Sequence, residues 1–265
     1  MGNVVAAGVL FLLIPLLLFV IGWRFWDGLN GPVERRRVEK FAERQDLVIT
    51  PENGGLVIGY LARIRRWRAI GLAVGVWAAI TGGFLSTDGY EAPVVVGAFA
   101  GWLCGAVGAE LVASHSPAGA RRRAELDRRG ITDYIPAHHI AYTGIVGCFA
   151  VATYFLSTTW TLGSGLPFAE GFLLPVLGLV LWATALHRIL RRPSLAETSD
   201  QVAADHAVRG YSLKVINSLT FALMCLEWSA NVDVGFIMLA GLLGAWLMFK
   251  HGRTVSQPES ERVAA

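Results

Sequence analysis

Long hydrophobic blocks separated by charged segments dominate the pattern of this chain. A lipid bilayer with a core of about 30 Å needs about 20 apolar residues in each helix that crosses it. Seven blocks approach or exceed this length, at residues 4–23, 69–86, 93–113, 140–158, 169–188, 212–230 and 233–250. Helices satisfy their own backbone hydrogen bonds in lipid, whereas an open sheet does not. The pattern therefore predicts an all-α polytopic bundle of seven transmembrane helices, which forms a single integral membrane domain over residues 1–265.

The positive charges alternate with the hydrophobic blocks. All 23 Lys and Arg residues lie in segments 24–68, 114–139, 188–214 and 250–265, and the intervening segments contain none. Because basic loops stay on the cytoplasmic side during insertion, the N-terminus is predicted outside and the C-terminus inside, as in a multi-pass protein of the plasma membrane. The net charge of +3 is then explained by topology and by anionic lipid headgroups at the inner leaflet. It gives no reason to expect nucleic-acid binding.

Small residues recur at every fourth position in two neighbouring blocks. The first series is Gly71, Gly75, Ala79 and Gly83, and the second is Gly97, Gly101, Gly105 and Ala109. Residues four apart lie on one face of a helix, and small residues let helix backbones approach closely in lipid. We therefore expect these two helices to pack as a tight antiparallel hairpin through a helix-packing seam of Gly71, Gly75, Gly83, Gly97, Gly101 and Gly105.

The longest basic segment, residues 24–68, is predicted to be cytoplasmic and to contain amphipathic helices. Thr50-Pro51-Glu52 has the composition of a helix start, with Thr as the N-cap and Pro at the first helical position. Apolar residues then recur at helical spacing, and the segment ends on Arg63, Arg65, Arg66 and Arg68. This pattern predicts a helix on the inner membrane surface with its arginines among lipid headgroups. A docking face for a protein partner is the alternative. The tail at 251–265 is predicted to be disordered and cytoplasmic.

Glu110 is the main candidate for chemistry within the hydrophobic blocks. An ionisable residue inside a span is costly and is a functional hypothesis by default. Glu110 is either a proton or cation site or a carboxylate that extends to the inner interface, and its place near the end of block 93–113 favours the second. The chain has no phosphate-binding loop, nucleophile elbow or zinc motif. No catalytic residue, metal or cofactor is therefore predicted.

Several short motifs in the basic segments resemble one family. They are Thr50-Pro51-Glu52-Asn53, Tyr60-Leu61-Ala62-Arg63, Arg65-Arg66-Trp67-Arg68, Asp133-Tyr134-Ile135-Pro136 and Ala203-Ala204-Asp205-His206-Ala207-Val208-Arg209. They are similar to cytoplasmic-loop motifs of uncharacterised multi-spanning membrane proteins from high-GC Gram-positive bacteria. The resemblance implies a multi-pass fold and carries no assigned activity or functional residue.

Three hypotheses for function follow. The first is an accessory or interaction subunit whose cytoplasmic helices dock a membrane or cytoplasmic protein. It is favoured because catalytic motifs are absent and the blocks hold few charges. The second is a small transporter or channel that uses Glu110. The third is a membrane-embedded enzyme, for which the sequence gives the least support.

Overall fold

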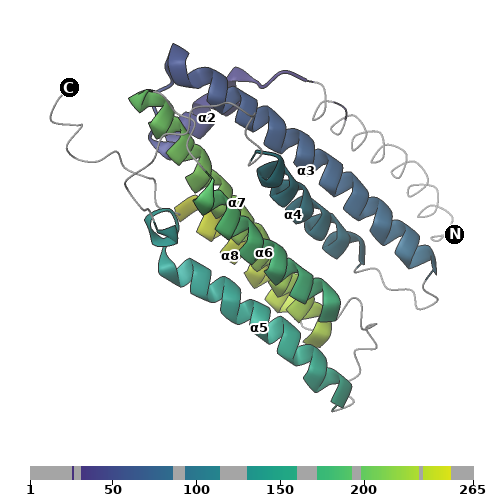
Figure 1. Cartoon of the computed structure of the whole chain (residues 1–265). Coiled ribbons are helices and arrows are strands. Elements are labelled where there is room, and N and C mark those ends of the chain that lie inside the picture. Colours follow the sequence, from purple (N-terminus) through teal and green to yellow (C-terminus); the bar gives the residue numbers. More distant parts are fainter. Residues whose placement is uncertain are drawn as a thin grey trace, which may run out of the picture.

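The computed structural model describes residues 26, 31–85, 93–113, 130–159, 172–192, 198–232 and 235–251. Within these ranges the chain is all-helical, and the helices run side by side as a bundle (Figure 1). The elements are α2 (Arg35–Gln45), α3 (Pro51–Leu85), α4 (Pro93–Ala113), the 3-10 turn η1 (Ile131–Asp133), α5 (Ala137–Thr159), α6 (Leu174–Arg191), α7 (Ser199–Val232) and α8 (Gly235–His251). Block 4–23, the turn that joins α3 to α4, and the tail beyond His251 lie outside the described residues.

Helices occur at the other six predicted hydrophobic blocks. Helix α4 has the bounds predicted for block 93–113, whereas α3 and α7 are longer than their blocks and continue into the basic segments. Two helices in the described part of the chain are long and apolar enough to cross a membrane, over Ala137–Leu156 and Leu174–Arg191. Val96–Val112 and Phe236–Lys250 are apolar but shorter. An all-helical fold with candidate membrane helices is thus confirmed, whereas the number of spans stays a prediction.

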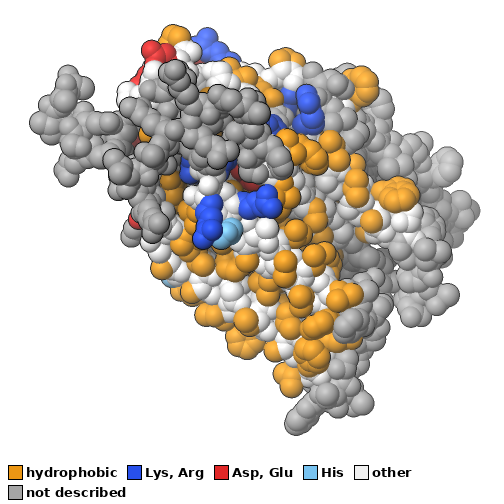
Figure 2. Space-filling model, in the orientation of Figure 1, with side chains coloured by type: hydrophobic (Ala, Val, Ile, Leu, Met, Phe, Trp, Pro, Cys, Tyr) orange, Lys and Arg blue, Asp and Glu red, His pale blue; other side chains and the backbone are white. Residues whose placement is uncertain are grey.

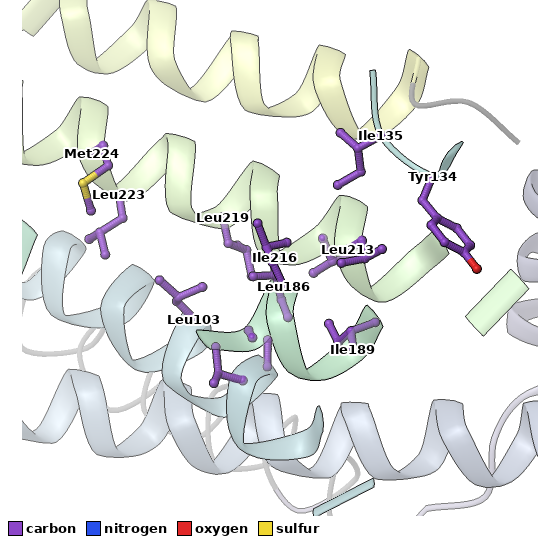
Figure 3. Close-up of a cluster of buried hydrophobic side chains, with 14 residues drawn as sticks. Leu103, Tyr134, Ile135, Leu186, Ile189, Leu213, Ile216, Leu219, Leu223 and Met224 are labelled. Atoms are coloured by element: carbon purple, nitrogen blue, oxygen red, sulfur yellow. The ribbon is translucent and has the colours of Figure 1, made fainter. Parts of the chain in front are cut away.

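Helix α7 lies at the centre of the bundle and contacts α3, α4, α5, α6 and α8. Its apolar residues Leu213, Ile216, Leu219, Leu223 and Met224 are buried against α4, α6 and the segment after η1 (Figure 3). Polar side chains on α7 are also buried, and they join helices together. Asn217, for example, accepts a hydrogen bond from Trp182 Nε1 at 3.1 Å. A central helix of this kind can carry polar groups because its neighbours supply their partners.

Helices α3 and α4 pack through the two glycine series in antiparallel order. A Cβ built on Gly71 would collide with the backbone of Gly101 and Gly105, and one on Gly75 with that of Gly97 and Gly101. Such contacts leave no room for any side chain, so glycine is required at these positions. The surroundings of Gly83 are outside what the structure describes.

A second, smaller core lies at the end of the bundle where α3 and α7 begin. It is formed by α2 and the first halves of α3 and α7, and it buries Val38, Phe41, Val57, Tyr60 and Ile64. The sequence predicted that the apolar face of residues 51–68 lies on the membrane surface. In the structure that face is covered by α2 and α7, because α3 continues without a break and carries the segment onto them.

The start of α3 also differs in detail from the expected cap. The helix begins at Pro51 as predicted, but the side chain of Asn53 makes the capping contacts. Its Oδ1 accepts from the Thr50 N–H at 2.9 Å, and its Nδ2 donates to the Val48 carbonyl at 2.8 Å. The Thr50 hydroxyl, which was expected to cap the helix, is buried without a hydrogen bond. Asn53 therefore fixes where α3 begins.

The face of the bundle in Figure 2 is strongly apolar over most of its lower part. The large exposed side chains of the bundle include Trp77 on α3, Trp102 on α4, Phe149 and Phe155 on α5, Leu177 and Val180 on α6, and Phe236, Leu239 and Trp246 on α8. The Lys and Arg side chains visible in the view of Figure 2 lie in its upper half, the half that holds α2 and the start of α3. The surface is thus divided into an apolar belt and a basic end.

Candidate functional site: a buried charge cluster at the basic end

Four charged side chains meet in the interior, at the boundary between the two cores. Glu110 comes from α4, Arg192 follows α6, and Asp205 and Arg209 lie one turn apart on α7. Arg192 is the link: its Nη2 lies 2.7 Å from Asp205 Oδ1, and its Nη1 lies 3.6 Å from Glu110 Oε2. Arg209 binds the other Asp205 oxygen with its Nε at 2.9 Å and its Nη2 at 2.6 Å. Two positive and two negative groups therefore balance within the cluster.

The cluster is shielded from solvent. The Glu110 side chain is 2% exposed and that of Arg192 11% exposed. Isolated charges in such surroundings are strongly unfavourable, and they persist only when paired and hydrogen-bonded. The sequence favoured a Glu110 carboxylate extended to an aqueous interface. The structure instead places it inside the protein, because Arg192 and Ser212 bind it there.

A chain of hydroxyl groups connects Glu110 to α3. Ser212 Oγ donates to Glu110 Oε1 at 2.6 Å and lies 2.7 Å from the Tyr60 hydroxyl. Because a serine has a single hydroxyl hydrogen and an ionised carboxylate only accepts, Tyr60 must donate to Ser212 whenever Ser212 donates to Glu110. The result is a directed chain, Tyr60 to Ser212 to Glu110, across three helices.

The surroundings shift the pKa values of the groups that belong to the basic segments. Burial and the nearby Glu110 charge raise the pKa of Tyr60 well above its ordinary value, so its hydroxyl stays protonated. Burial alone would raise the pKa of Asp205, but Arg192 and Arg209 outweigh burial and hold that pKa below its ordinary value. Burial alone would lower the pKa of Arg192, yet Asp205 and Glu110 raise it. Both side chains are thus charged at neutral pH.

A second buried contact lies beside the cluster. The Tyr134 hydroxyl is 2.9 Å from Nδ1 of His206, which follows Asp205 on α7. Tyr134 is in the segment that links η1 to α5, so this contact attaches that segment to α7. No group of three or more His, Cys, Asp or Glu residues within the described ranges is arranged to hold a metal ion.

The predicted arginines of residues 63–68 divide into two kinds. Arg63 and Arg66 are exposed, whereas Arg65 and Arg68 are half-buried. Arg65 donates to the carbonyls of Pro32 and Gly31, and the guanidinium of Arg68 lies 5.9 Å from the centre of the Tyr211 ring. Contact of these arginines with lipid headgroups stays a prediction.

Sequence reasoning found Glu110 but missed its partners. Asp205 and Arg209 are four residues apart, the spacing of an ion pair on a helix, and this signal was present in the sequence. Nothing in the sequence shows that Arg192 or Tyr60 approaches Glu110, because these residues are far apart in the chain and meet only through helix packing.

Comparison of the chain with protein-family models, curated proteins and solved structures finds no match. The resemblance to uncharacterised multi-spanning membrane proteins from high-GC Gram-positive bacteria stays a prediction, and functional inference rests on the residues of this chain alone.

Proposed function

We propose that the chain is a multi-pass protein of the plasma membrane with seven spans, its N-terminus outside and its basic end in the cytoplasm. The support is the division of the surface into an apolar belt and a basic end. Only 22% of the Ala137–Leu156 window and 28% of the Leu174–Arg191 window are buried. Core helices of water-soluble proteins are mostly buried, so a lipid environment accounts better for helices that expose large side chains such as Phe149 and Leu177.

The native cysteines test this placement. Cys104 and Cys148 are exposed on the apolar belt, and Cys225 is buried. A water-soluble maleimide that does not cross membranes should leave all three unlabelled in intact membranes and label them after denaturation in SDS. Labelling of Cys104 and Cys148 in intact membranes would show that the belt faces water and would contradict the proposal.

The orientation has its own test in two introduced cysteines. In intact cells the same reagent should label Asp88→Cys, because that turn is predicted outside. It should label Arg122→Cys only after the membrane is permeabilised. The reverse pattern would overturn the orientation.

Within the membrane, an accessory or interaction role is the function that we favour. The observation that carries it is the pairing of the four cluster charges with one another, since Glu110, Arg192, Asp205 and Arg209 are engaged in holding helices together. The cluster fixes the second core, with α2 and the start of α3, at the cytoplasmic face. The tip of this second core exposes Val48, Ile49 and Ile58, which are apolar side chains suited to contact with a protein partner.

Purification in mild detergent, followed by mass measurement of the intact assembly, tests this role. We expect a stoichiometric second protein, and a photo-crosslinking residue at Ile58 should capture that protein as one adduct. The control is the same crosslinker at Phe155, which is exposed on the apolar belt near the C-terminal end of α5. It should not capture that protein. A lone monomer or homo-oligomer without an Ile58 adduct would contradict the role.

A transporter that uses Glu110 is the second candidate. The specific observation in its favour is the hydroxyl chain from Tyr60 through Ser212 to Glu110, because such chains can pass protons. Glu110→Gln separates the two functions. Proton or cation flux in vesicles that disappears with Glu110→Gln would favour transport, whereas an unchanged assembly with no flux in either protein would favour the accessory role.

A further inference from the structure

The second core carries a cavity of about 360 Å³ on the side where α2 crosses α3. Its walls come from α2, α3, α4 and α7. Five of its eleven lining residues are basic, namely Arg37, Lys40, Arg44, Arg65 and Arg68, and none is acidic. The remaining lining residues are apolar or aromatic, with Phe41 and Tyr211 in edge-on contact at 5.4 Å between ring centres. The cavity therefore combines concentrated positive charge with an apolar floor.

Among the described residues, the charge of Glu110 acts on Arg68, but the other charges around this cavity are poorly neutralised. Within the described ranges, Arg37 has only a long, exposed pair with Glu34 at 3.6 Å. Arg44 and Arg68 lie over the rings of Phe249 and Tyr211. In addition, Arg68 Nε and Nη2 and Arg65 Nε are buried without a hydrogen-bond acceptor. Buried donors without acceptors are costly, and an anionic group in the cavity would supply acceptors to these arginines.

The position of the cavity suggests where such a group comes from. Trp102, one of its lining residues, is also exposed on the apolar belt of α4. The cavity thus joins the basic end to the surface that we place in lipid. A phosphate among the five cations and acyl chains along Trp102 would match both parts of the site, whereas a free phosphate compound would use only the cations.

We infer that this cavity binds the headgroup of one anionic phospholipid from the inner leaflet. This inference rests on the proposed membrane placement, and it is independent of the number of spans and of any protein partner. Arg65 and Arg68 form the inner wall of the site, and the α2 residues Arg37, Lys40 and Arg44 form its outer wall.

Native mass spectrometry of the whole chain in neutral detergent tests the inference. Dioleoyl phosphatidylglycerol should bind with one site tighter than the rest, and dioleoyl phosphatidylcholine should not. Glycerol phosphate, the soluble headgroup, should fail to bind at the same concentration. Equal binding of glycerol phosphate would overturn the lipid as the ligand, and equal binding of phosphatidylcholine would overturn recognition of the charge.

Two double variants of α2 locate the site. Lys40→Gln/Arg44→Gln removes two cavity charges, whereas Arg35→Gln/Arg36→Gln removes two exposed charges of the same helix that do not line the cavity. We expect phosphatidylglycerol to bind about twenty-fivefold more weakly to the first variant, from two contacts each worth about fivefold. The second should bind like the wild type. Equal effects of the two variants on lipid binding would show a diffuse charge attraction and overturn the site. The cysteine labelling described above reports separately on membrane placement.

Discussion

Replacement of Arg192 by Met should be the most damaging single change in the charge cluster. Among the described residues, Arg192 is the one that contacts both buried carboxylates of the cluster, Asp205 at 2.7 Å and Glu110 at 3.6 Å. Without it, Asp205 still has Arg209 as a partner. Glu110 would keep the hydroxyl of Ser212 as a hydrogen-bond donor. Its buried charge would lose the ion pair with Arg192 and keep only the weaker attraction of Arg68 and Arg63.

The magnitude follows from the distances and the burial. At 3.6 Å and an effective dielectric constant of about 20, two unit charges attract by roughly 5 kcal/mol. Removal of one partner from a buried ion pair costs about 3–5 kcal/mol, because the other charge remains desolvated. For a chain of this size that loss corresponds to a melting temperature lower by roughly 10 °C.

Thermal unfolding in neutral detergent, followed by circular dichroism, measures this loss. Arg191→Met is the matched control, since Arg191 is the preceding residue and is exposed. Its free energy of unfolding should change by less than about 0.5 kcal/mol. The double variant Glu110→Gln/Arg192→Met should recover part of the loss, because it removes the unpaired charge as well. If Arg192→Met and Arg191→Met were equally stable, the cluster would not exist in the form described.

Two further predictions concern the helix seam and the pH dependence. Gly101→Val should separate α3 from α4 and lower the melting temperature, because even a Cβ at Gly101 would lie 2.7 Å from Gly75 Cα. Gly144→Val on α5 is the control and should be tolerated, because a Cβ there meets nothing within 4 Å. Similar losses of melting temperature for both variants would refute the seam. The depressed pKa of Asp205 implies that its stabilising effect is complete above its ordinary value of 3.8 and is lost as the pH falls through the lower pKa of the folded state. The stability difference between wild type and Asp205→Asn should therefore be constant at neutral pH and shrink in acid titrations below pH 3.8; a difference that grows on acidification would contradict this assignment.

Local pattern was sufficient to locate the helices, because hydrophobic block length and helix-start chemistry act over a few residues. Block 93–113 has the bounds of α4, and Pro51 begins α3. The sequence pattern was insufficient where the apolar face of a segment could be buried either by lipid or by protein. The apolar face of residues 51–68 fits a membrane surface or a protein surface equally well, and only the long-range packing of α2 and α7 decides for protein. The side chains that contact Glu110 could not be predicted from the sequence, because they too depend on long-range packing.

The place of the charge cluster between the two cores suggests why such a costly arrangement is present. Val107 on α4 and Leu213 on α7 belong to the bundle core, whereas Ala109 and Val208 belong to the second core, so Glu110 and Ser212 lie where one core gives way to the other. Apolar contacts specify helix register weakly, since neighbouring registers bury similar areas. Four charges that must pair specify one register, which is the best-attested use of buried polar groups. In a membrane protein with an accessory role, this register would hold α2 and its basic cavity at one fixed height above the bundle, where a partner or a lipid headgroup meets it.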